Sequence, residues 1–592
     1  MSSWAGKGNV CYWILLLFLT GILAGCARKD ATVPEESVVD VFVESSGQAE
    51  ELMQEFPEYS AAKSHLTGGE WDKAAAVLEK LLQGKEPPAP FANDLGVVEM
   101  RRGQLEQAKV AFQQAVEIDP EYERAWFNLG VLNIRLGTTE EAEAAYEKAL
   151  QINPYYYEAR YNLGLLFYQQ GRLQEAEFAF RYIAGKTRSD RFNRVYYQLG
   201  LIFADQGNDS AAVGFYDESL LLDPSHLPSY LNKAAALIRL KLPEKARETL
   251  EKARRLSPDD SRVYWNLGLT YLDEKDDLSA EGAFKRTLSL DPQYAPALIN
   301  LATISMRAGN LEEAKGLLEK ARLLEPENPS IPWNLGLIAA DEGADLEAIG
   351  HFTDSVELDP GNAEAHLNIS AALIRLGQLE KAREAISRAT ALSPEDYRIF
   401  WNRGLIALQE DQDATAQEDF QRVVELQPDY APALFNLGLS EYRAGNLGEA
   451  KDYFHRAAYA DPENPYPEAH YMLGKAYSDQ GNPNAAINEY EVAVNLKPDY
   501  FEAAYNLALN LDEAGDHKEA VRLYKRLADG PGAPPEALNN LAAHWLGENQ
   551  PGKAVPFLER ALELDPAYST AAYNLGLARL RMEDFQIGRA SC

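Results

Sequence analysis

The sequence predicts an all-α solenoid of stacked helix–turn–helix units, and three regularities carry this prediction. A leucine anchor returns with a period of 34 residues along most of the 592-residue chain. In every complete unit an alanine stands thirteen residues after the anchor slot. Apolar residues recur at i, i+3, i+4 and i+7 in both halves of the period, as amphipathic helices require. Each unit would pack only on its neighbours, so the chain length demands no division into globular domains.

The period places each unit along the chain. Every step between anchor slots is 34 residues, except the steps from 163 to 199 and from 437 to 473, which are 36. We therefore expect about fifteen complete units, followed by a truncated sixteenth that lacks its second helix. The anchor slots are Ala61, Leu95, Leu129, Leu163, Leu199, Lys233, Leu267, Leu301, Leu335, Ile369, Arg403, Leu437, Leu473, Leu507, Leu541 and Leu575.

Residues 126–154 show how the two helices of a unit are expected to meet. The first helix contains Asn-Leu-Gly at 128–130, and the glycine lets a second helix approach closely. In the second helix, Ala142 indicates a tight crossing and Tyr146 adds a large apolar group. Pro154 ends the unit, because proline cannot continue a helix.

On these residues the unit resembles the tetratricopeptide repeat. The resemblance covers residues 51–585 and implies a right-handed superhelical solenoid. In this family the first helices line a concave surface that binds proteins or extended peptides, so the resemblance also implies such partners.

Residues 1–25 are predicted to be a lipoprotein signal peptide. The apolar run at 12–23 is shorter than the roughly 20 residues of a transmembrane helix. It ends in Leu-Ala-Gly-Cys, which resembles the lipobox of bacterial lipoproteins and implies lipid on Cys26. Ala27 favours the periplasmic face of the outer membrane, with the inner membrane as the alternative. A short uncleaved anchor or an ordinary secretory signal are the other interpretations.

The two ends of the array lack the repeat pattern. Residues 26–50 are expected to form the lipidated cysteine and a tether to the membrane. Residues 586–592 are expected to be a sequencing-adapter artefact, because Ile-Gly-Arg-Ala-Ser-Cys matches the translation of a common adapter.

Composition and motifs narrow the classes of function. The chain carries 57 Lys and Arg against 91 Asp and Glu, a net charge of −34, which argues against nucleic acid as a partner. The eight histidines show no metal-binding spacing, and no nucleophile stands with a base. The sequence therefore predicts a protein that is not an enzyme and uses no cofactor or metal.

The units alternate between two types, which gives the sequence a second period of two units. Trp265, Trp333 and Trp401 are 68 residues apart, or two units. Their units carry an acid or amide six residues after the anchor, and the intervening units carry arginine there. A ladder of ion pairs between units and a charge pattern offered to a ligand are the two interpretations. The arginines are Arg239, Arg307, Arg375 and Arg443.

A column of asparagines directly before the anchor is the candidate site. An asparagine side chain offers a donor and an acceptor, so such a column can pair with a peptide backbone without reading its sequence. Trp265, Trp333 and Trp401 would add apolar pockets beside it. The alternative is that the aromatics pack between first helices. The column comprises Asn128, Asn162, Asn232, Asn266, Asn300, Asn334, Asn368, Asn402, Asn436, Asn506, Asn540 and Asn574.

Together these features predict a lipid-anchored scaffold for a bacterial envelope assembly, such as a pilus, a secretion system or a polysaccharide exporter. The contrasting hypothesis is that the repeats are the substrate-holding arm of an enzyme whose catalytic domain lies beyond residue 585.

Overall fold

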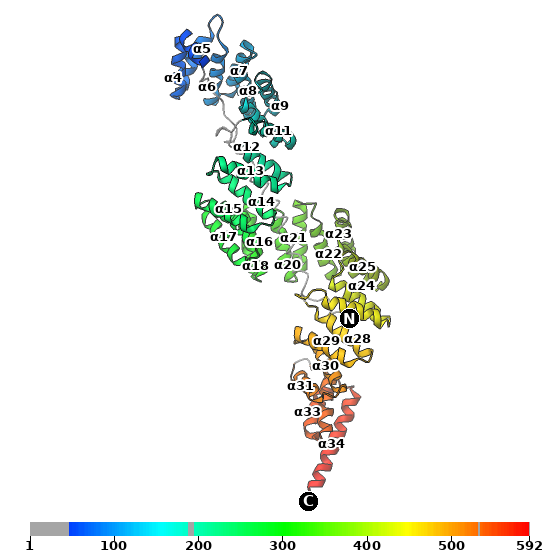
Figure 1. The fold of residues 1–592 in the computed structure, drawn as a ribbon. Helices are drawn as coiled ribbons and strands as arrows, with labels where there is room; N and C mark the ends of the chain where they lie inside the picture. The colour runs from blue at the N-terminus through cyan, green and yellow to red at the C-terminus, as the bar shows by residue number, and fades with distance from the viewer. Residues whose placement is uncertain (1–46, 187–193, 464, 531–532, 591–592) are drawn as a thin grey trace. The chain divides into compact units, whose positions relative to one another are not determined.

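The computed structural model describes residues 47–186, 194–463, 465–530 and 533–590. The predicted signal peptide, Cys26 and most of the tether lie outside these ranges. Within them the chain forms 32 α-helices and no strand, which confirms the all-α class. The helices group into two bodies, an N-terminal body that ends at residue 326 and a C-terminal body that begins at residue 327 (Figure 1).

The N-terminal body contains the first seventeen described helices. They are α3 (Gly47–Glu55), α4 (Pro57–Thr67), α5 (Trp71–Leu82), α6 (Ala89–Arg101), α7 (Leu105–Ile118), α8 (Glu123–Leu136), α9 (Thr139–Ile152), α10 (Tyr157–Gln169), α11 (Leu173–Ala184), α12 (Arg194–Asp205), α13 (Asp209–Leu222), α14 (Leu227–Arg239), α15 (Pro243–Leu256), α16 (Ser261–Asp273), α17 (Asp277–Leu290), α18 (Ala295–Arg307) and α19 (Leu311–Leu324).

The C-terminal body contains the remaining fifteen. They are α20 (Ser330–Asp341), α21 (Asp345–Leu358), α22 (Ala363–Arg375), α23 (Leu379–Leu392), α24 (Tyr397–Gln409), α25 (Asp413–Leu426), α26 (Ala431–Arg443), α27 (Leu447–Tyr459), α28 (Pro467–Asp479), α29 (Pro483–Leu496), α30 (Phe501–Glu513), α31 (His517–Asp529), α32 (Pro535–Gly547), α33 (Pro551–Leu564) and α34 (Ser569–Ala590).

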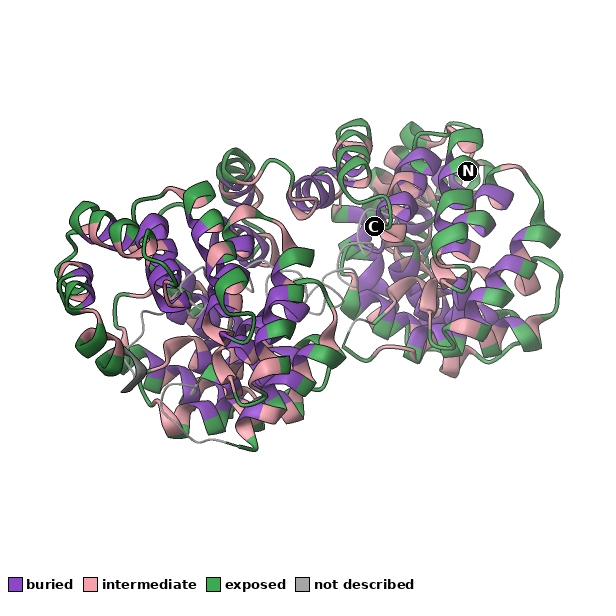
Figure 2. Cartoon of the chain, turned by 90° about the horizontal axis from the view of Figure 1, so that it is seen from above, coloured by how far each residue is buried: buried purple, intermediate pink, exposed green. Residues whose placement is uncertain are grey.

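From α4 onwards the even-numbered helices are the first helices of the units and the odd-numbered helices are the second. Within each body, a first helix packs against its own second helix, and that second helix packs against the next first helix. Buried residues therefore lie between successive helices, and the exposed residues lie on their outer faces (Figure 2). This arrangement confirms the predicted solenoid of helix–turn–helix units.

The helices of a unit cross where the sequence predicts. A Cβ on Gly130 would lie 2.6 Å from the Tyr146 ring, and one on Gly336 would lie 2.7 Å from the Phe352 ring. The aromatic ring therefore rests directly on the glycine backbone. The alanine thirteen residues after the anchor is at most 1% exposed in every unit: Ala74, Ala108, Ala142, Ala176, Ala212, Ala246, Ala280, Ala314, Ala348, Ala382, Ala416, Ala450, Ala486, Ala520 and Ala554.

The alternating charges form ion pairs between neighbouring units. Three of the four arginines, Arg239, Arg307 and Arg375, reach an aspartate at the start of the preceding second helix, not the acid in the equivalent slot of the neighbouring unit. The N–O distances are 2.5 Å for Arg239–Asp209, 2.9 Å for Arg307–Asp277 and 2.6 Å for Arg375–Asp345.

Two acids of the other unit type also form side-chain contacts. Asp205 accepts a hydrogen bond of 2.6 Å from the Tyr168 hydroxyl, and Asp273 pairs with Lys241 at 2.6 Å. These contacts favour the interpretation of the charge row as a structural ladder.

Candidate peptide-binding site

The first helices hold the asparagine column at their tightly packed middle. Because the column directly precedes the anchor, its side chains lie beside the preceding first helix. Six of the predicted residues are buried and six are half-buried. The buried ones are Asn128, Asn162, Asn266, Asn300, Asn334 and Asn402, and the half-buried ones are Asn232, Asn368, Asn436, Asn506, Asn540 and Asn574.

Several of these amides donate hydrogen bonds to the preceding unit. The acceptor is most often the hydroxyl of a tyrosine 35 residues earlier, as for Asn232 and Tyr197 at 3.1 Å. Burial raises the pKa of Tyr197 to about 12, so this hydroxyl stays protonated and accepts through a lone pair. Two further amides donate to a tyrosine hydroxyl, Asn506 to Tyr471 (3.3 Å) and Asn540 to Tyr505 (3.5 Å). Two donate to other side chains of the preceding unit, Asn128 to the Asn93 amide oxygen (2.8 Å) and Asn402 to the Ser370 hydroxyl (2.6 Å).

Four other amides donate a hydrogen bond, three of them within their own helix and one to the second helix of the preceding unit. Three donate to the carbonyl four residues earlier in their own helix, a local bond that turns the side chain along the helix. They are Asn266 to Arg262 (2.9 Å), Asn334 to Ser330 (2.7 Å) and Asn436 to Pro432 (2.8 Å), while Asn162 reaches the Tyr146 hydroxyl at 3.4 Å.

Asn300 and Asn368 differ from the rest of the column. Within the described residues, neither amide nitrogen has a hydrogen-bond acceptor. The residue 35 positions earlier is Trp265 in one case and Trp333 in the other, and an indole N–H donates but does not accept. The Trp265 indole nitrogen also lacks an acceptor within the described residues. The α16–α18 junction therefore holds two spare donors in the slots where Tyr197 and Asn232 bond to each other.

The three predicted tryptophans pack against aromatic rings of their own unit or of the next unit. Trp265 and Trp333 are buried, and Trp401 is half-buried. The ring of Trp333 lies with its centroid 5.3 Å from that of Phe352, on the second helix of the same unit. Trp265 lies 5.8 Å from Tyr294, at the start of the next unit. Trp333 packs within its own unit and Trp265 against the next, so packing between first helices and contact with a peptide both stay predictions.

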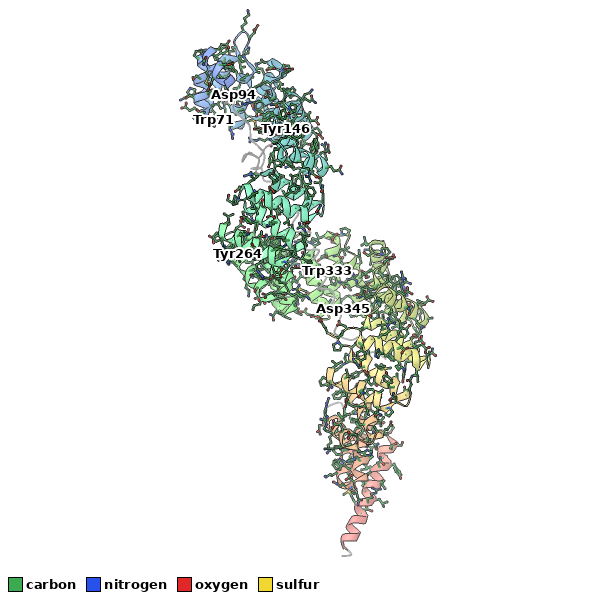
Figure 3. All side chains as sticks on the ribbon, in the orientation of Figure 1. Trp71, Asp94, Tyr146, Tyr264, Trp333 and Asp345 are labelled. Atoms are coloured by element: carbon green, nitrogen blue, oxygen red, sulfur yellow. The ribbon has the colours of Figure 1, made fainter. Side chains whose placement is uncertain are left out.

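Sequence reasoning missed a buried charge near the start of the array. Asp94 stands in the asparagine slot of α6 and is fully buried (Figure 3). It pairs with Lys63 at 2.6 Å and accepts a hydrogen bond of 2.7 Å from the Tyr59 hydroxyl. The aspartate in place of asparagine was visible in the sequence, but its partners on α4 were not. The cluster ties the first two units together.

The described residues contain no group of three or more potential metal ligands. None of the helices described is long and apolar enough to span a membrane. The proposed lipid site, Cys26, lies outside the described residues, so its modification stays a prediction.

Family models of the tetratricopeptide repeat match several stretches of the array. Models of the tetratricopeptide repeat match residues 93–157 and 231–295, 134–191 and 271–335, and 194–226. A model of the protein kinase G tetratricopeptide repeat matches residues 318–531.

Individual relatives match only short stretches. Tetratricopeptide repeat protein 8 of Caenorhabditis elegans is 37% identical over 120 residues, which is 20% of this chain and 24% of that protein. Human protein O-mannosyl-transferase TMTC3 is 27% identical over 120 residues, 20% of this chain and 13% of that protein. The matches thus span less than a quarter of either relative.

Among solved structures, the Cut9–Hcn1 hetero-tetramer of the APC/C is 16% identical, with a TM-score of 0.41. The alignment covers 85% of this chain and 98% of that one. The repeat matches and the regular helix pairs agree on the same units. The chain therefore belongs to the tetratricopeptide repeat family, whose arrays act as scaffolds for protein–protein interactions.

Proposed function

We propose that this chain is a lipid-anchored scaffold that holds extended segments of partner proteins during assembly of a bacterial envelope complex. The Leu-Ala-Gly-Cys sequence at 23–26 supports the anchor. The repeat array supports the protein partners. A pilus, a secretion system and a polysaccharide exporter are the candidate assemblies.

The observation that carries the peptide-holding role is the pair of spare donors at the α16–α18 junction. A buried hydrogen-bond donor without an acceptor lowers the stability of a protein by about 1–3 kcal/mol. A ligand that supplies an acceptor at the α16–α18 junction would therefore be bound favourably. The backbone of an extended peptide presents a carbonyl at every residue, and it would supply that acceptor without regard to sequence on entering the junction, where the donor nitrogens are now buried. Asn300 and Trp265 are therefore the proposed donors in the N-terminal body, and Asn368 is the proposed donor in the C-terminal body.

Photo-crosslinking in the producing bacterium tests the partner class. A photoreactive residue replaces Leu439, a half-buried first-helix position two residues after the anchor. The matched control carries the same group at Leu346, which is 71% exposed on a second helix. We expect envelope proteins to be captured at Leu439 and not at Leu346. Equal capture at both positions, or capture of cytosolic proteins alone, contradicts the proposal.

Metabolic labelling with palmitate tests the anchor. The wild-type chain is expected to take up label and sediment with outer membranes, whereas Cys26→Ser takes up none and is released. A wild-type chain without label contradicts lipidation and leaves the protein-binding role to stand on the crosslinking result.

A second function is supported by the names of two matches, a kinase-associated repeat model and a mannosyl-transferase. Under this alternative the repeats hold a substrate for a catalytic domain encoded after residue 585. Sequencing the gene past that codon separates the two functions, because a further non-repeat domain with a catalytic motif is required by the enzyme alternative alone.

A further inference from the structure

A recurring side-chain cover protects the connectors between units in the N-terminal body. The residue three positions before the anchor reaches back to the carbonyl of the proline that closes the preceding unit. The bonds are Trp126 to Pro120 (3.0 Å), Arg160 to Pro154 (3.2 Å), Tyr230 to Pro224 (3.2 Å) and Tyr264 to Pro258 (2.9 Å). In these four units a polar or aromatic side chain therefore lies across the connector.

In two units the residue three positions before the anchor cannot reach this carbonyl, and an arginine on the second helix donates the hydrogen bond to it instead. Leu434 and Ala504 cannot donate a hydrogen bond, and the arginine nineteen residues after the anchor reaches the proline carbonyl instead. The bonds are Arg456 to Pro428 (3.0 Å) and Arg526 to Pro498 (2.5 Å).

The unit anchored at Leu301 has neither cover. Leu298 stands where the preceding unit has Tyr264, and Lys320 stands in the slot that holds Arg456 and Arg526 in those two units. Within the described ranges, no side chain donates to the Pro292 carbonyl, and Lys320 forms no ion pair. A notch of about 370 Å³ opens there between α17, α18 and α19. This α18 notch is lined by Leu288, Pro292, Leu298, Lys320, Leu323 and Leu324.

The walls of the notch are apolar and part of them is openly exposed. Leu323 is 86% exposed, a high value for a leucine beside a cavity. Fully burying a leucine side chain stabilises by roughly 1.5–3 kcal/mol, so covering this surface is favourable.

The preceding unit shows which group fits such a place. There the Tyr264 ring lies across the connector, and the Arg286 guanidinium is 5.5 Å from the ring centroid (Figure 3 labels Tyr264). Arg286 and Lys320 occupy the same slot of successive units, as do Pro258 and Pro292. A phenol ring placed over Leu298 would thus find a cation above it and an open carbonyl at its edge.

We propose that the α18 notch receives a tyrosine side chain from a partner protein. The ring covers Leu298 and Leu323, the hydroxyl donates to the Pro292 carbonyl, and the Lys320 ammonium lies over the ring. The inference rests on the proposed protein-binding function, but its surface is separate from the asparagine column.

Saturation-transfer NMR on the full chain with N-acetyl-tyrosinamide as the probe tests the proposal. We expect the tyrosine ring protons to be saturated by the wild-type protein, and N-acetyl-leucinamide to be saturated far less. Lys320→Gln is expected to weaken the probe's binding about 2- to 5-fold, through loss of the cation over the ring.

Two leucine-to-tyrosine variants form a matched pair. Leu298→Tyr fills the notch with the residue of the preceding unit and is expected to abolish probe saturation. Leu278→Tyr makes the same change at a position that is 81% exposed on α17, outside the notch, and should bind as wild type. In the opposite direction, Tyr264→Leu removes an existing cover and is expected to create a second site and increase the saturation.

Equal saturation of the tyrosine and leucine probes, or unchanged binding by folded Leu298→Tyr, overturns the proposal. Circular dichroism checks folding, and if Leu298→Tyr does not fold, the exposed Lys320→Glu variant decides, since unchanged binding there also overturns it. Crosslinking at Leu439 in the Leu298→Tyr background distinguishes this failure from failure of the scaffold function, because the two readouts use different surfaces.

Discussion

Gly336 and Gly350 lie in the same unit but in opposite surroundings. Gly336 faces the Phe352 ring, whereas a Cβ on Gly350 would meet nothing within 4 Å. Single residues of the array therefore divide into those that set the spacing of two helices and those that only continue one. The sequence shows both as glycine, and the difference lies in the neighbouring helix.

Gly336→Ala is expected to lower the free energy of unfolding by about 1–3 kcal/mol, because its methyl group overlaps a ring that cannot retreat. Gly350→Ala, the control, is expected to raise it by about 0.5–1 kcal/mol, because alanine loses less backbone entropy in a helix. Urea unfolding followed by circular dichroism measures both. Loss of stability in both variants would show that the ring contact is not the cause.

Asn232 and Asn300 give a second matched comparison. Asn232→Leu leaves the Tyr197 hydroxyl without its donor and is expected to cost about 1 kcal/mol. Asn300→Leu removes a donor that has no acceptor among the residues that the structure describes, and it is expected to be neutral or stabilising. Thermal melting checks both variants, and an equal loss of stability would mean that Asn300 has an acceptor in the free protein.

At the scale of helices and their junctions, the charge ladder carries the next prediction. Arg307→Glu faces Asp277 with a like charge and is expected to lower stability by about 0–1 kcal/mol, because both side chains are partly exposed. Adding Asp277→Arg restores the opposite charges and should recover most of the loss. Chemical unfolding of the four variants in a double-mutant cycle measures the coupling. Unchanged melting with loss of partner binding would instead favour the charge row as a ligand surface.

The α13–α14 junction is expected to weaken in mild acid. His226 lies with its ring 4.8 Å from the Tyr197 ring, and burial lowers its pKa below 6.5, with the Arg194 charge acting in the same direction. A lowered folded-state pKa means that the stability is fully present above pH 6.5 and is lost as pH falls through the folded value. His226→Tyr introduces the residue that occurs most often in this slot of the other units and should remove this pH-dependent component. Melting temperatures of both chains from pH 8 to 5 test the difference, and parallel curves would contradict it.

Much of the element pattern was predictable from sequence, because period, small residues and closing prolines act locally. The buried alanines and the glycine–aromatic crossings follow from spacing alone. Partner choice across junctions did not follow. Arg239 pairs with Asp209 rather than with the acid six residues after the anchor of a neighbouring unit. Asn300 differs from Asn232 because the residue 35 positions earlier is a tryptophan instead of a tyrosine. Both depend on which side chain faces which, and spacing does not encode that.

For the whole chain, stability is expected to be shared among neighbouring units. Deleting residues 227–294 removes two units and brings Arg307 opposite Asp209, as Arg239 is now. Deleting residues 261–294 removes one unit and brings Arg307 opposite Pro243. Both chains should keep their helicity per residue, because each unit contacts only its neighbours. The single-unit deletion should melt at the lower temperature, and collapse of helicity in both would contradict nearest-neighbour stabilisation.

The aromatic ring pressed against a glycine has a consequence for motion. A ring held as Tyr146 is against Gly130 turns over only when the two helices part, so its flip rate records how often that unit opens. The flip rates of selectively labelled rings, measured by NMR, would then report the opening rate of each unit along the array. They would show where it opens most readily, and therefore where a bound segment would most easily enter or leave.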